Sequence, residues 1–440
     1  MINYRTYAFG YLRGAFIWLL SVTCAGLLGP AGPDATYTMT NKAEKYLARA
    51  RILTASTERS YFDKATGVLH NNPSNWFSPS GCWDVTALLT MYTKMAALDK
   101  KYVKDADRAI YALGFYGRTT PGGGFSAYTG EWTTRQNASS GQVYYDDNMW
   151  VGRDLVELYK ITGDRKYLER AIIIADMIIA EGWTDLDGEM FAQRFGRDPD
   201  GPLGGFYWRD DHEALHTCSN GPAVQFLTLL SQVADNGKGE SYLDYAQKCY
   251  RFLKYLEHIG GDWDGVFWDL MRFHKDENNG ITGIHERAGA PLTYNSGTPI
   301  SSAVELYRVT GDESYLEDAV RWGRSADRYF ARNSPVPGVK AYENGLKTWF
   351  REILLMGFVD LYEFDLDALG YIQNMEGSVN YAYENHRLNG VLCWNRNLIP
   401  TAWVEGFKDE DAKKNGAALE QLPCAGIYAS LAAFYKAIEG

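Results

Sequence analysis

A repeated stretch decides the fold: Glu157-Leu158-Tyr159-Lys160-Ile161-Thr162-Gly163-Asp164-Arg165-Lys166-Tyr167-Leu168-Glu169 recurs as Glu305-Leu306-Tyr307-Arg308-Val309-Thr310-Gly311-Asp312-Glu313-Ser314-Tyr315-Leu316-Glu317. In each copy an apolar-periodic helix ends at a Gly, which can take the positive φ of a helix C-cap. The following Asp is a residue type that caps the next helix. Looser copies occur at residues 240–243 and 100–103. The repeat predicts helical hairpins in series.

Helical patterns recur along the rest of the chain, and no comparable set of alternating strands accompanies them. Helix pairs bury a continuous core by stacking on their neighbours, and they either run on as a solenoid or close into a ring. Closure is favoured, because the first helix has a partner only if the last helix supplies it. We therefore expect an all-α (α/α)6 toroid of six helical hairpins, built by residues 36–440 as a single catalytic domain. The expected helices lie near 40–56, 80–98, 101–117, 146–162, 164–182, 219–235, 240–258, 295–310, 312–332, 346–365, 367–384 and 418–438.

The N-terminal residues 1–35 resemble a leader. Arg5 and Arg13 precede an apolar run over residues 15–28, and Gly29-Pro30-Ala31 gives a small-residue exit. This order is typical of a secretory signal peptide, and the run is short for a transmembrane span. We expect a secreted or extracytoplasmic protein without a stable membrane anchor. The alternative is an N-terminal helix that packs on the domain.

Composition narrows the class of partner. The net charge of −11 argues against nucleic acid, which calls for clustered Lys and Arg. The chain has 13 Trp and 31 Tyr, whose flat rings suit sugar faces as well as interiors. The six Cys are scattered without a CxxC spacing, so they indicate neither a disulfide scaffold nor a zinc site. We expect no metal and no cofactor, and a monomer.

The candidate active centre is Val143-Tyr144-Tyr145-Asp146-Asp147-Asn148-Met149-Trp150, where two carboxylates begin a helical pattern. One Asp suffices to cap a helix, and two adjacent negative charges repel each other, so capping leaves the second Asp unexplained. Neighbours on a regular helix diverge by about 100°. With Asp146 still in loop conformation and Asp147 as the cap, both side chains could face a cleft. The helix N-terminus then favours ionisation of one Asp, whose charge raises the pKa of the other.

Segments rich in Gly and aromatic residues lead into the helices that should line the ring. We expect them to meet at one mouth, with caps at Ser219 with Asn220 and at Asn295 with Ser296. Their loop aromatics fit sugar stacking and packing about equally. These segments are residues 76–83, 141–148, 204–220, 265–297 and 391–403, and the loop aromatics are Tyr144, Tyr145, Phe206, Tyr207, Trp208, Trp268 and Trp394.

The motif His212-Glu213-Ala214-Leu215-His216 offers a different function, since HExxH on a helix is how zinc peptidases hold their metal. A third ligand from His274, His285 or Glu286 would be needed, and nothing fixes its distance. Gly221-Pro222 would also soon end such a helix. We therefore keep a zinc metallopeptidase only as a weak alternative.

Several motifs together resemble glycoside hydrolase family 76, the endo-α-1,6-mannanase family, over nearly the whole chain from about residue 40. They are Tyr-Asp-Asp-Asn at 145–148, Gly-Gly-Phe-Tyr-Trp at 204–208 leading to Ser-Asn-Gly at 219–221, and Thr-Tyr-Asn-Ser-Gly at 293–297. The resemblance implies an (α/α)6 barrel and retaining, endo-acting hydrolysis of α-1,6-mannosidic bonds in mannan. It implies Asp146 as nucleophile and Asp147 as acid/base. The expected substrate-binding residues are Tyr145, Asn148, Tyr207, Trp208, Asn220, Trp268, Tyr294 and Asn295.

One segment departs from the family pattern. Residues 209–216 are longer and more charged than expected between the Gly-Gly-aromatic motif and the Ser-Asn helix start. This leaves the sugar preference of the subsites open. A transglycosidase, or a glycan-binding protein on the same barrel, remains an alternative because a fold does not fix a function.

Overall fold

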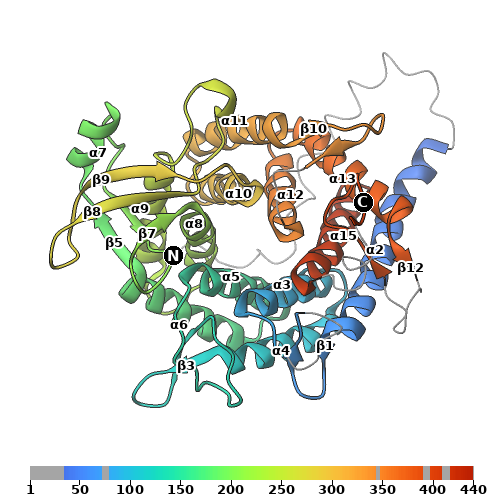
Figure 1. Cartoon of the computed structure of the whole chain (residues 1–440), viewed down its shortest axis with the longest axis horizontal. Helices are drawn as coiled ribbons and strands as arrows, with labels where there is room; N and C mark the ends of the chain where they lie inside the picture. Colours follow the sequence, from blue (N-terminus) through green and yellow to red (C-terminus); the bar gives the residue numbers. More distant parts are fainter. Residues whose placement is uncertain (1–33, 72–78, 343–346, 390–396, 409–416, 440) are drawn as a thin grey trace, which may run out of the picture.

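The computed structural model describes residues 34–71, 79–342, 347–389, 397–408 and 417–439. Six helices form an inner ring in which each packs against the next, and the last packs against the first (Figure 1). The ring therefore closes. Its helices in order are α3 (Cys82–Leu98), α5 (Tyr145–Thr162), α8 (Thr217–Ser231), α10 (Thr293–Thr310), α12 (Thr348–Tyr362) and α15 (Ala418–Glu439).

An outer helix covers each inner helix. The first outer helix, α2, packs on α15, so the two ends of the described chain form the sixth pair. This confirms the (α/α)6 toroid and the partnership of the first and last helices. The outer helices are α2 (Asp34–Tyr61), α4 (Val103–Leu113), α6 (Arg165–Gly182), α9 (Gly239–Leu253), α11 (Glu313–Phe330) and α13 (Ala368–Asn385).

The repeated stretch builds its hairpins as predicted. Gly163 ends α5 with a φ of 74°, and the Asp164 side chain accepts from the N–H of Lys166 to cap α6. Gly311 and Asp312 do the same between α10 and α11, with φ 71° at the glycine. A residue with a Cβ is strained at such φ, so in these two hairpins the glycine ends the inner helix and the outer helix begins two residues later.

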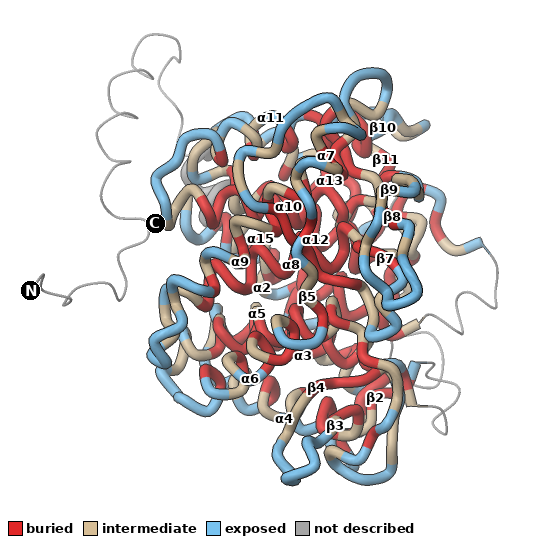
Figure 2. The backbone as a smooth tube through the Cα atoms, turned by 90° about the vertical axis from the view of Figure 1, so that its left-hand side faces the viewer, coloured by how far each residue is buried: buried red, intermediate tan, exposed pale blue. Residues whose placement is uncertain are grey.

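The inner helices are buried on almost every side, whereas the outer helices bury one face (Figure 2). In α8 every residue from Thr217 to Leu230 is buried. Deeper in the ring the space is filled by ion pairs, such as Lys94 to Glu352 at 2.7 Å and Arg153 to Asp154 at 3.0 Å. The ring is thus filled through its middle rather than open as a pore.

Strands occur in all six connections that lead from an outer helix to the next inner helix, which the sequence analysis did not predict. They are short antiparallel pairs, with one three-stranded sheet. The pairs are β1 (Phe62–Asp63) with β2 (Val68–Leu69), β3 (Gly117–Thr119) with β4 (Phe125–Tyr128), β5 (Trp183–Leu186) with β6 (Leu203–Phe206), β10 (Arg332–Asn333) with β11 (Lys340–Ala341) and β12 (Leu388–Asn389) with β13 (Asn397–Leu398). The three-stranded sheet joins β7 (Ala214–His216), β8 (Leu270–Lys275) and β9 (Ile281–Ala288), and the remaining short helices are α7 (Gly188–Phe195) and 3-10 turns at Lys100–Tyr102, Gly114–Tyr116 and Gly261–Trp263.

The two kinds of connection differ in length, and this locates the mouth. The connections from inner to outer helices are short, such as Gly163-Asp164, whereas those from outer to inner helices carry the strands and the projecting β8–β9 hairpin. The long connections gather where the inner helices begin. Side chains in the first turns of the inner helices therefore lie at the end of the ring where the long connections are. At this end the connections can form the walls of a site. None of the helices in the described part has the length and hydropathy to cross a bilayer.

Candidate active site

The two carboxylates lie inside the first turn of α5. The helix begins at Tyr145, so Asp146 and Asp147 are its second and third residues, and Tyr144 at the N-cap supplies no side-chain cap. The expectation that Asp146 lies in a loop while Asp147 caps the helix is wrong. Two of the first N–H groups of α5 find other partners: Trp208 O accepts from the N–H of Tyr145 at 2.9 Å, and the side-chain Oδ1 of Asp146 accepts from the N–H of Asp147 at 3.0 Å.

Buried amide side chains fix the start of three inner helices. Asn148, the fourth residue of α5, bonds the N–H and C=O of Tyr128, both at 2.8 Å. Asn220, the fourth residue of α8, bonds the same two groups of Phe206, at 2.8 and 2.9 Å. Gln421, the fourth residue of α15, does so with Ile399. Asn148 and Asn220 are 0% exposed, so their amides hold the connections to the helix starts rather than reaching a sugar.

Asp146 is held by donors from two directions. Trp208 Nε1–H donates to its Oδ2 at 3.1 Å, and the N–H of Asp147 donates to its Oδ1 at 3.0 Å. Cys218 of α8 is a neighbour of this carboxyl. Burial raises the pKa of the Asp146 carboxyl above its usual range, and these donors oppose that rise. Of the two carboxyls, Asp146 is therefore the better suited to carry negative charge.

Asp147 has the opposite surroundings. Burial raises the pKa of its carboxyl well above the usual range, and the negative charges of Asp146 and Asp84 raise it further. Asp84 is the third residue of α3, accepts from the N–H of Gly81 at 3.1 Å, and has its own pKa raised to about 6 by burial. Asp147 is therefore the carboxyl that keeps its proton. Adjacent carboxyls with separated pKa values are what acid/base chemistry at near-neutral pH requires.

An aromatic wall faces the carboxyl pair across the ring. Phe350 of α12 stacks on Tyr294 of α10 with centroids 4.2 Å apart, and on Trp83 of α3 at 5.8 Å. Lys347 lies over the Trp83 ring at 4.9 Å. These residues lie in the first turns of α10, α12 and α3, or just before them. The partly exposed rings of Trp83 and Tyr294, with the buried Phe350 between them, form a surface that suits a pyranose ring.

The structure separates the aromatics that the sequence grouped together. Trp208 lies at the carboxyl pair and packs against Tyr144 at 5.4 Å and His216 at 4.7 Å. Tyr207 is 5% exposed and stacks on His212 on the other side of the strand. Tyr145 is buried, and its hydroxyl donates to Glu181 O at 3.0 Å. Tyr207 and Tyr145 therefore have packing positions.

Trp268 belongs to a separate aromatic cluster. Its ring stacks on His258 at 3.9 Å and meets Trp263 at 5.7 Å. Asn295 is buried, and its amide donates to Asp269 Oδ1 at 2.8 Å, which fixes the residue that follows Trp268. Of the predicted substrate-binding residues, the structure brings Trp208 and Tyr294 to Asp146 and Asp147, and gives the others hydrogen bonds or packing within the fold.

The HExxH segment lacks the geometry of a zinc peptidase. Residues 214–216 form strand β7, and His212 has a φ of 57°, so the two histidines do not lie one turn apart on a helix. The His212 ring lies at 2.9 Å from Glu181 O, and His216 lies 3.8 Å from Asp269. Among the described residues no group of three His, Cys, Asp or Glu side chains could hold a metal ion.

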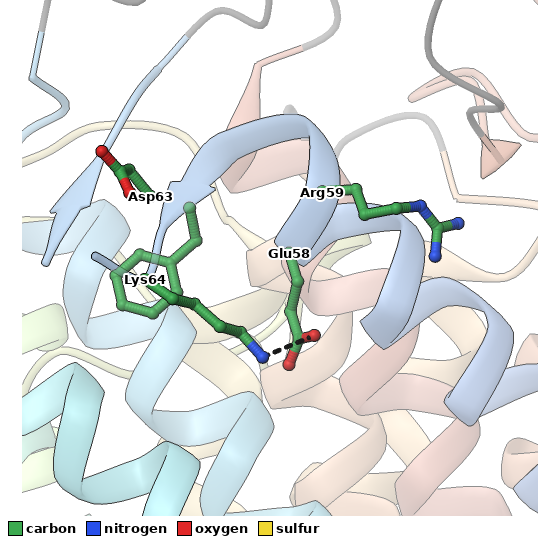
Figure 3. A pocket seen from close by; sticks show the side chains of 5 residues that line it. Glu58, Arg59, Asp63 and Lys64 are labelled. Carbon is green, nitrogen blue, oxygen red and sulfur yellow. Dashed lines mark ion pairs between the residues drawn. The ribbon is translucent and has the colours of Figure 1, made fainter. Parts of the chain in front are cut away.

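A surface hollow of about 350 Å³ lies away from the carboxyl pair, where α2 passes into β1 (Figure 3). Lys64 and Glu58 form an ion pair across it at 2.8 Å. Tyr92 also donates to Glu58 at 2.8 Å. The second acid of this hollow, Asp63, accepts from the N–H of Ala65 and from the Thr66 hydroxyl. Both acids are therefore already engaged by neighbouring groups.

Sequence reasoning missed Trp83, Asp84, Cys218 and Phe350. Each is the second or third residue of an inner helix. Aligning the six helix starts would have found them, since position two of α5 is Asp146. Trp394 and parts of the segments 76–83 and 391–403 lie outside the described residues, as do Cys24, Cys393 and residues 1–33 of the expected leader.

Comparison with known families identifies the class. The model of glycosyl hydrolase family 76 matches residues 45–361, most of the chain. The chain therefore belongs to glycosyl hydrolase family 76 and is a glycoside hydrolase, as the motifs indicated. No curated protein sequence matches it.

Solved structures support the same fold. A family 76 mannosidase from Bacteroides thetaiotaomicron VPI-5482 is 23% identical, with a TM-score of 0.72 over 89% of this chain and 99% of that one. The GH76A α-1,6-mannanase of Salegentibacter sp. HEL1_6 is 21% identical, with a TM-score of 0.64 over 88% of this chain and 99% of that one. An inactive variant of that mannanase, with two consecutive aspartates replaced by asparagine, was solved in complex with α-1,6-mannotriose.

Proposed function

We propose that this protein is a retaining, endo-acting hydrolase of α-1,6-mannosidic bonds in mannan, with Asp146 as nucleophile and Asp147 as acid/base. The observation that carries the proposal is the adjacent carboxyl pair, whose two members have unequal surroundings. The family supports the reaction class, and the structural relatives named as α-1,6-mannanases support the substrate. The aromatic wall supports a sugar polymer rather than a charged ligand.

The reaction uses both carboxyls twice. Asp147 donates its proton to the glycosidic oxygen while the bond from that oxygen to C1 breaks, and an Asp146 oxygen bonds to C1 from the opposite face. This gives a β-mannosyl ester on Asp146 and a free chain with a new hydroxyl. Asp147, now ionised, takes a proton from water as the water oxygen attacks C1. Asp146 leaves, Asp147 is protonated again, and the product has the α-configuration of the substrate.

Positioning of the sugar falls to Trp208, Tyr294 and the rest of the aromatic wall. Trp208 donates to Asp146 and exposes part of its ring, so it can orient the nucleophile and contact the sugar together. In this proposal the remaining predicted residues hold these groups in place without contacting the sugar. They are Tyr145, Asn148, Tyr207, Asn220, Trp268 and Asn295. Their hydrogen bonds and packing are already made within the protein.

A product profile on linear α-1,6-mannan and on branched mannan tests the proposal. Endo action releases mixed short oligosaccharides from the linear polymer early in the reaction, and proton NMR detects the α-anomer first. Binding without any product on long incubation would instead make the chain a glycan-binding protein. Transfer of mannosyl units to an added sugar acceptor, without reducing sugar, would make it a transglycosidase. Turnover of another glycan only would remove mannan as the substrate.

We also propose that residues 1–35 are a secretory leader and that residues 36–440 work as a monomeric catalytic domain. The charge and apolar order of residues 5–31 supports the leader. N-terminal sequencing of protein recovered outside the cell tests it, with a new terminus near residue 36 expected. An intact Met1 on active protein would contradict it. Light scattering of the purified protein checks the monomer.

A further inference from the structure

We propose that Arg209 is a positioning residue for the nucleophile, because its guanidinium lies over the Trp208 ring and strengthens the hydrogen bond from Trp208 to Asp146. The inference deepens the proposed function and rests on it for the role of Asp146. Arg209 acts on the carboxylate through Trp208, so it is not itself a catalytic residue. The proposal also gives a use to the charged residues 209–216, which depart from the family pattern.

Measured contacts join the three side chains in a row. Trp208 Nε1–H donates to Asp146 Oδ2 at 3.1 Å. The guanidinium carbon of Arg209 lies 4.8 Å from the centroid of the Trp208 ring. The negative face of an indole attracts a cation at this distance. The cation in turn draws electron density from the ring, so the Nε1–H group becomes a stronger donor to the carboxylate.

Two acids of the same segment hold the guanidinium in place. Arg209 Nη2 lies 2.6 Å from Asp211 Oδ2 and 2.7 Å from Glu213 Oε2. The Nε of Arg209 is buried and has no hydrogen-bond acceptor among the described residues. A buried N–H without an acceptor is costly, and contact with an electron-rich ring offsets part of that cost. The guanidinium is therefore placed for the ring rather than for a full set of hydrogen bonds.

Backbone hydrogen bonds fix the chain on both sides of this contact. The N–H of Trp208 donates to Ala214 O at 3.1 Å, which closes the segment onto β7. Asp210 Oδ2 accepts from the N–H of Val143 at 3.0 Å, just before α5 begins. The contact between Arg209 and Trp208 therefore does not depend on a free loop.

Other titratable groups face this row from the neighbouring elements. Around Trp208 and Arg209 they are His216, Asp269, Arg272, Lys275 and Glu286, of which His216 lies 4.7 Å from the Trp208 ring. Around the carboxyl pair they are Cys82 and Asp84 of α3, Cys218 of α8 and Tyr294 of α10. A variant at Arg209 alone leaves all of these groups in place.

The first test needs no substrate. Two-dimensional ¹H–¹⁵N NMR of the indole N–H groups follows Trp208 directly, and Trp208→Phe assigns its peak. We expect the peak to move in a step as Asp146 titrates, and Asp146→Asn should abolish that step. Arg209→Met keeps an unbranched side chain near the ring but removes the charge. It should move the midpoint of the step to higher pH by roughly half a unit, because the charged carboxylate loses support.

Arg332→Met is the matched control for the first test. It removes a guanidinium that lies over another ring, that of Tyr329, at the same distance of 4.8 Å. The midpoint seen at Trp208 should not change in this variant. An unchanged midpoint in Arg209→Met, or an equal shift in Arg332→Met, would overturn the proposal.

The second test uses the acid limb of the pH profile of kcat/KM on manno-oligosaccharides, which follows the ionisation of Asp146. Arg209→Met should move this limb to higher pH by roughly half a unit. Trp208→Phe keeps a ring but has no N–H, so Arg209→Met should move the limb much less in that background. Equal shifts in both backgrounds would show that Arg209 does not act through Trp208. A higher KM with an unmoved limb would make Arg209 a sugar-binding residue instead.

The two tests separate the two proposals. If the protein turns over no mannan while Arg209→Met moves the midpoint seen at Trp208, the positioning role stands and the substrate assignment fails. If mannan is cleaved while that midpoint stays in place, the proposed function stands and the positioning role fails. Melting temperatures of all variants show whether folding, rather than positioning, has changed.

Discussion

Asp146 and Asp147 are neighbours in sequence and differ in what surrounds them. Asp146 accepts hydrogen bonds from Trp208 and a backbone N–H, whereas Asp147 faces two negative charges. A difference in donors becomes a difference in protonation because desolvation makes the charged form of each carboxyl costly. The roles assigned by resemblance thus agree with the electrostatics of the site.

The first prediction separates the two roles. Asp146→Ala should be inactive on every mannoside, because no covalent mannosyl ester can form. Asp147→Ala should lose about 10²–10⁴-fold on mannan but cleave a mannoside with an activated leaving group in a burst, because that group departs without a proton. Stopped-flow release of the leaving group measures both.

Azide supplies the control. It should rescue Asp147→Ala and give an α-mannosyl azide, because it displaces Asp146 from the β-mannosyl ester with inversion at C1 and needs no base. Rescue of Asp146→Ala instead would reverse the two roles. An inverted first product from the unmodified enzyme would contradict the double displacement.

The second prediction concerns the alkaline limb of activity, which belongs to Asp147 as the acid. Asp84→Asn removes a negative neighbour, so the ionised form of Asp147 becomes less unfavourable and its pKa falls. The alkaline limb of kcat/KM should move to lower pH by roughly half a unit to one unit. The acid limb, which follows ionisation of Asp146, should stay in place. Asp164→Asn, at the far end of α5, is the control and should move neither limb. An unmoved alkaline limb in Asp84→Asn would show that Asp84 does not act on Asp147.

At the scale of elements, the buried amides join each inner helix to the connection before it. Asn220 bonds Phe206 on both backbone groups and His216 O at 2.7 Å. Two residues after Phe206, Trp208 donates to Asp146. The Asn220 amide therefore helps to position the nucleophile Asp146, because it fixes Phe206 at the end of β6 and so the nearby Trp208 that donates to Asp146.

The third prediction tests this link. Asn220→Ala leaves the buried N–H and C=O of Phe206 without the amide, so unfolding in urea should show a loss of about 3–5 kcal/mol of stability. Activity should also fall below that of the unmodified protein at temperatures where the variant is fully folded, because Trp208 is no longer fixed. Asn385→Ala removes an exposed amide that donates within its own helix, and it should cost under about 0.5 kcal/mol. Equal losses in the two variants would refute a positioning role for Asn220.

The helices were predictable because each carries a long apolar period and an end signal, such as Gly163 followed by Asp164. The strands were not, because strands of two to four residues show too few alternations to detect. The β8–β9 hairpin did carry a signal: Asn279, with a φ of 63°, and Gly280 form its turn. Missing the strands also hid which loop aromatics face the site, since Tyr207 stacks on His212 while the next residue, Trp208, donates to Asp146.

At the scale of the whole molecule, one sequence motif predicted the carboxyl pair. The groups that surround the two carboxyls could not be predicted in this way. Asp84, Cys218 and Tyr294 come from three different hairpins, and the packing of α3, α5, α8 and α10 in order brings them near the pair. Sequence predicted the closure of the ring from the unpaired first helix, and the packing of α2 on α15 confirms it. The exact register of one hairpin against the next depends on close contacts across the ring, such as the approach of Gly297 to the Ile353 backbone.

The fourth prediction tests the closing contact. Arg49 of α2 is 8% exposed and donates to Asn380 Oδ1 and to Glu384, both at 2.6 Å, and to the Tyr428 hydroxyl at 3.3 Å. Arg49→Ala removes these bonds between α2, α13 and α15, and should lower the free energy of unfolding by about 2–3 kcal/mol. Lys45→Ala, which loses only an exposed pair with Glu384 at 3.5 Å, should change it by under about 0.5 kcal/mol. Urea unfolding followed by circular dichroism measures the stability of both variants. Similar small losses of stability in the two variants would show that the contacts of Arg49 with α13 and α15 do not stabilise the closed ring.

Pairing the first outer helix with the last inner one has a consequence for synthesis on the ribosome. The partner of α2 is α15, which ends at Glu439. At typical translation rates the nascent chain carries an uncovered α2 for roughly 20–80 s before α15 emerges. During that interval α5, with its two aspartates, is already made but no ring encloses it. The apolar face of α2 is therefore the surface that a chaperone would meet first, and activity begins only with the last helix.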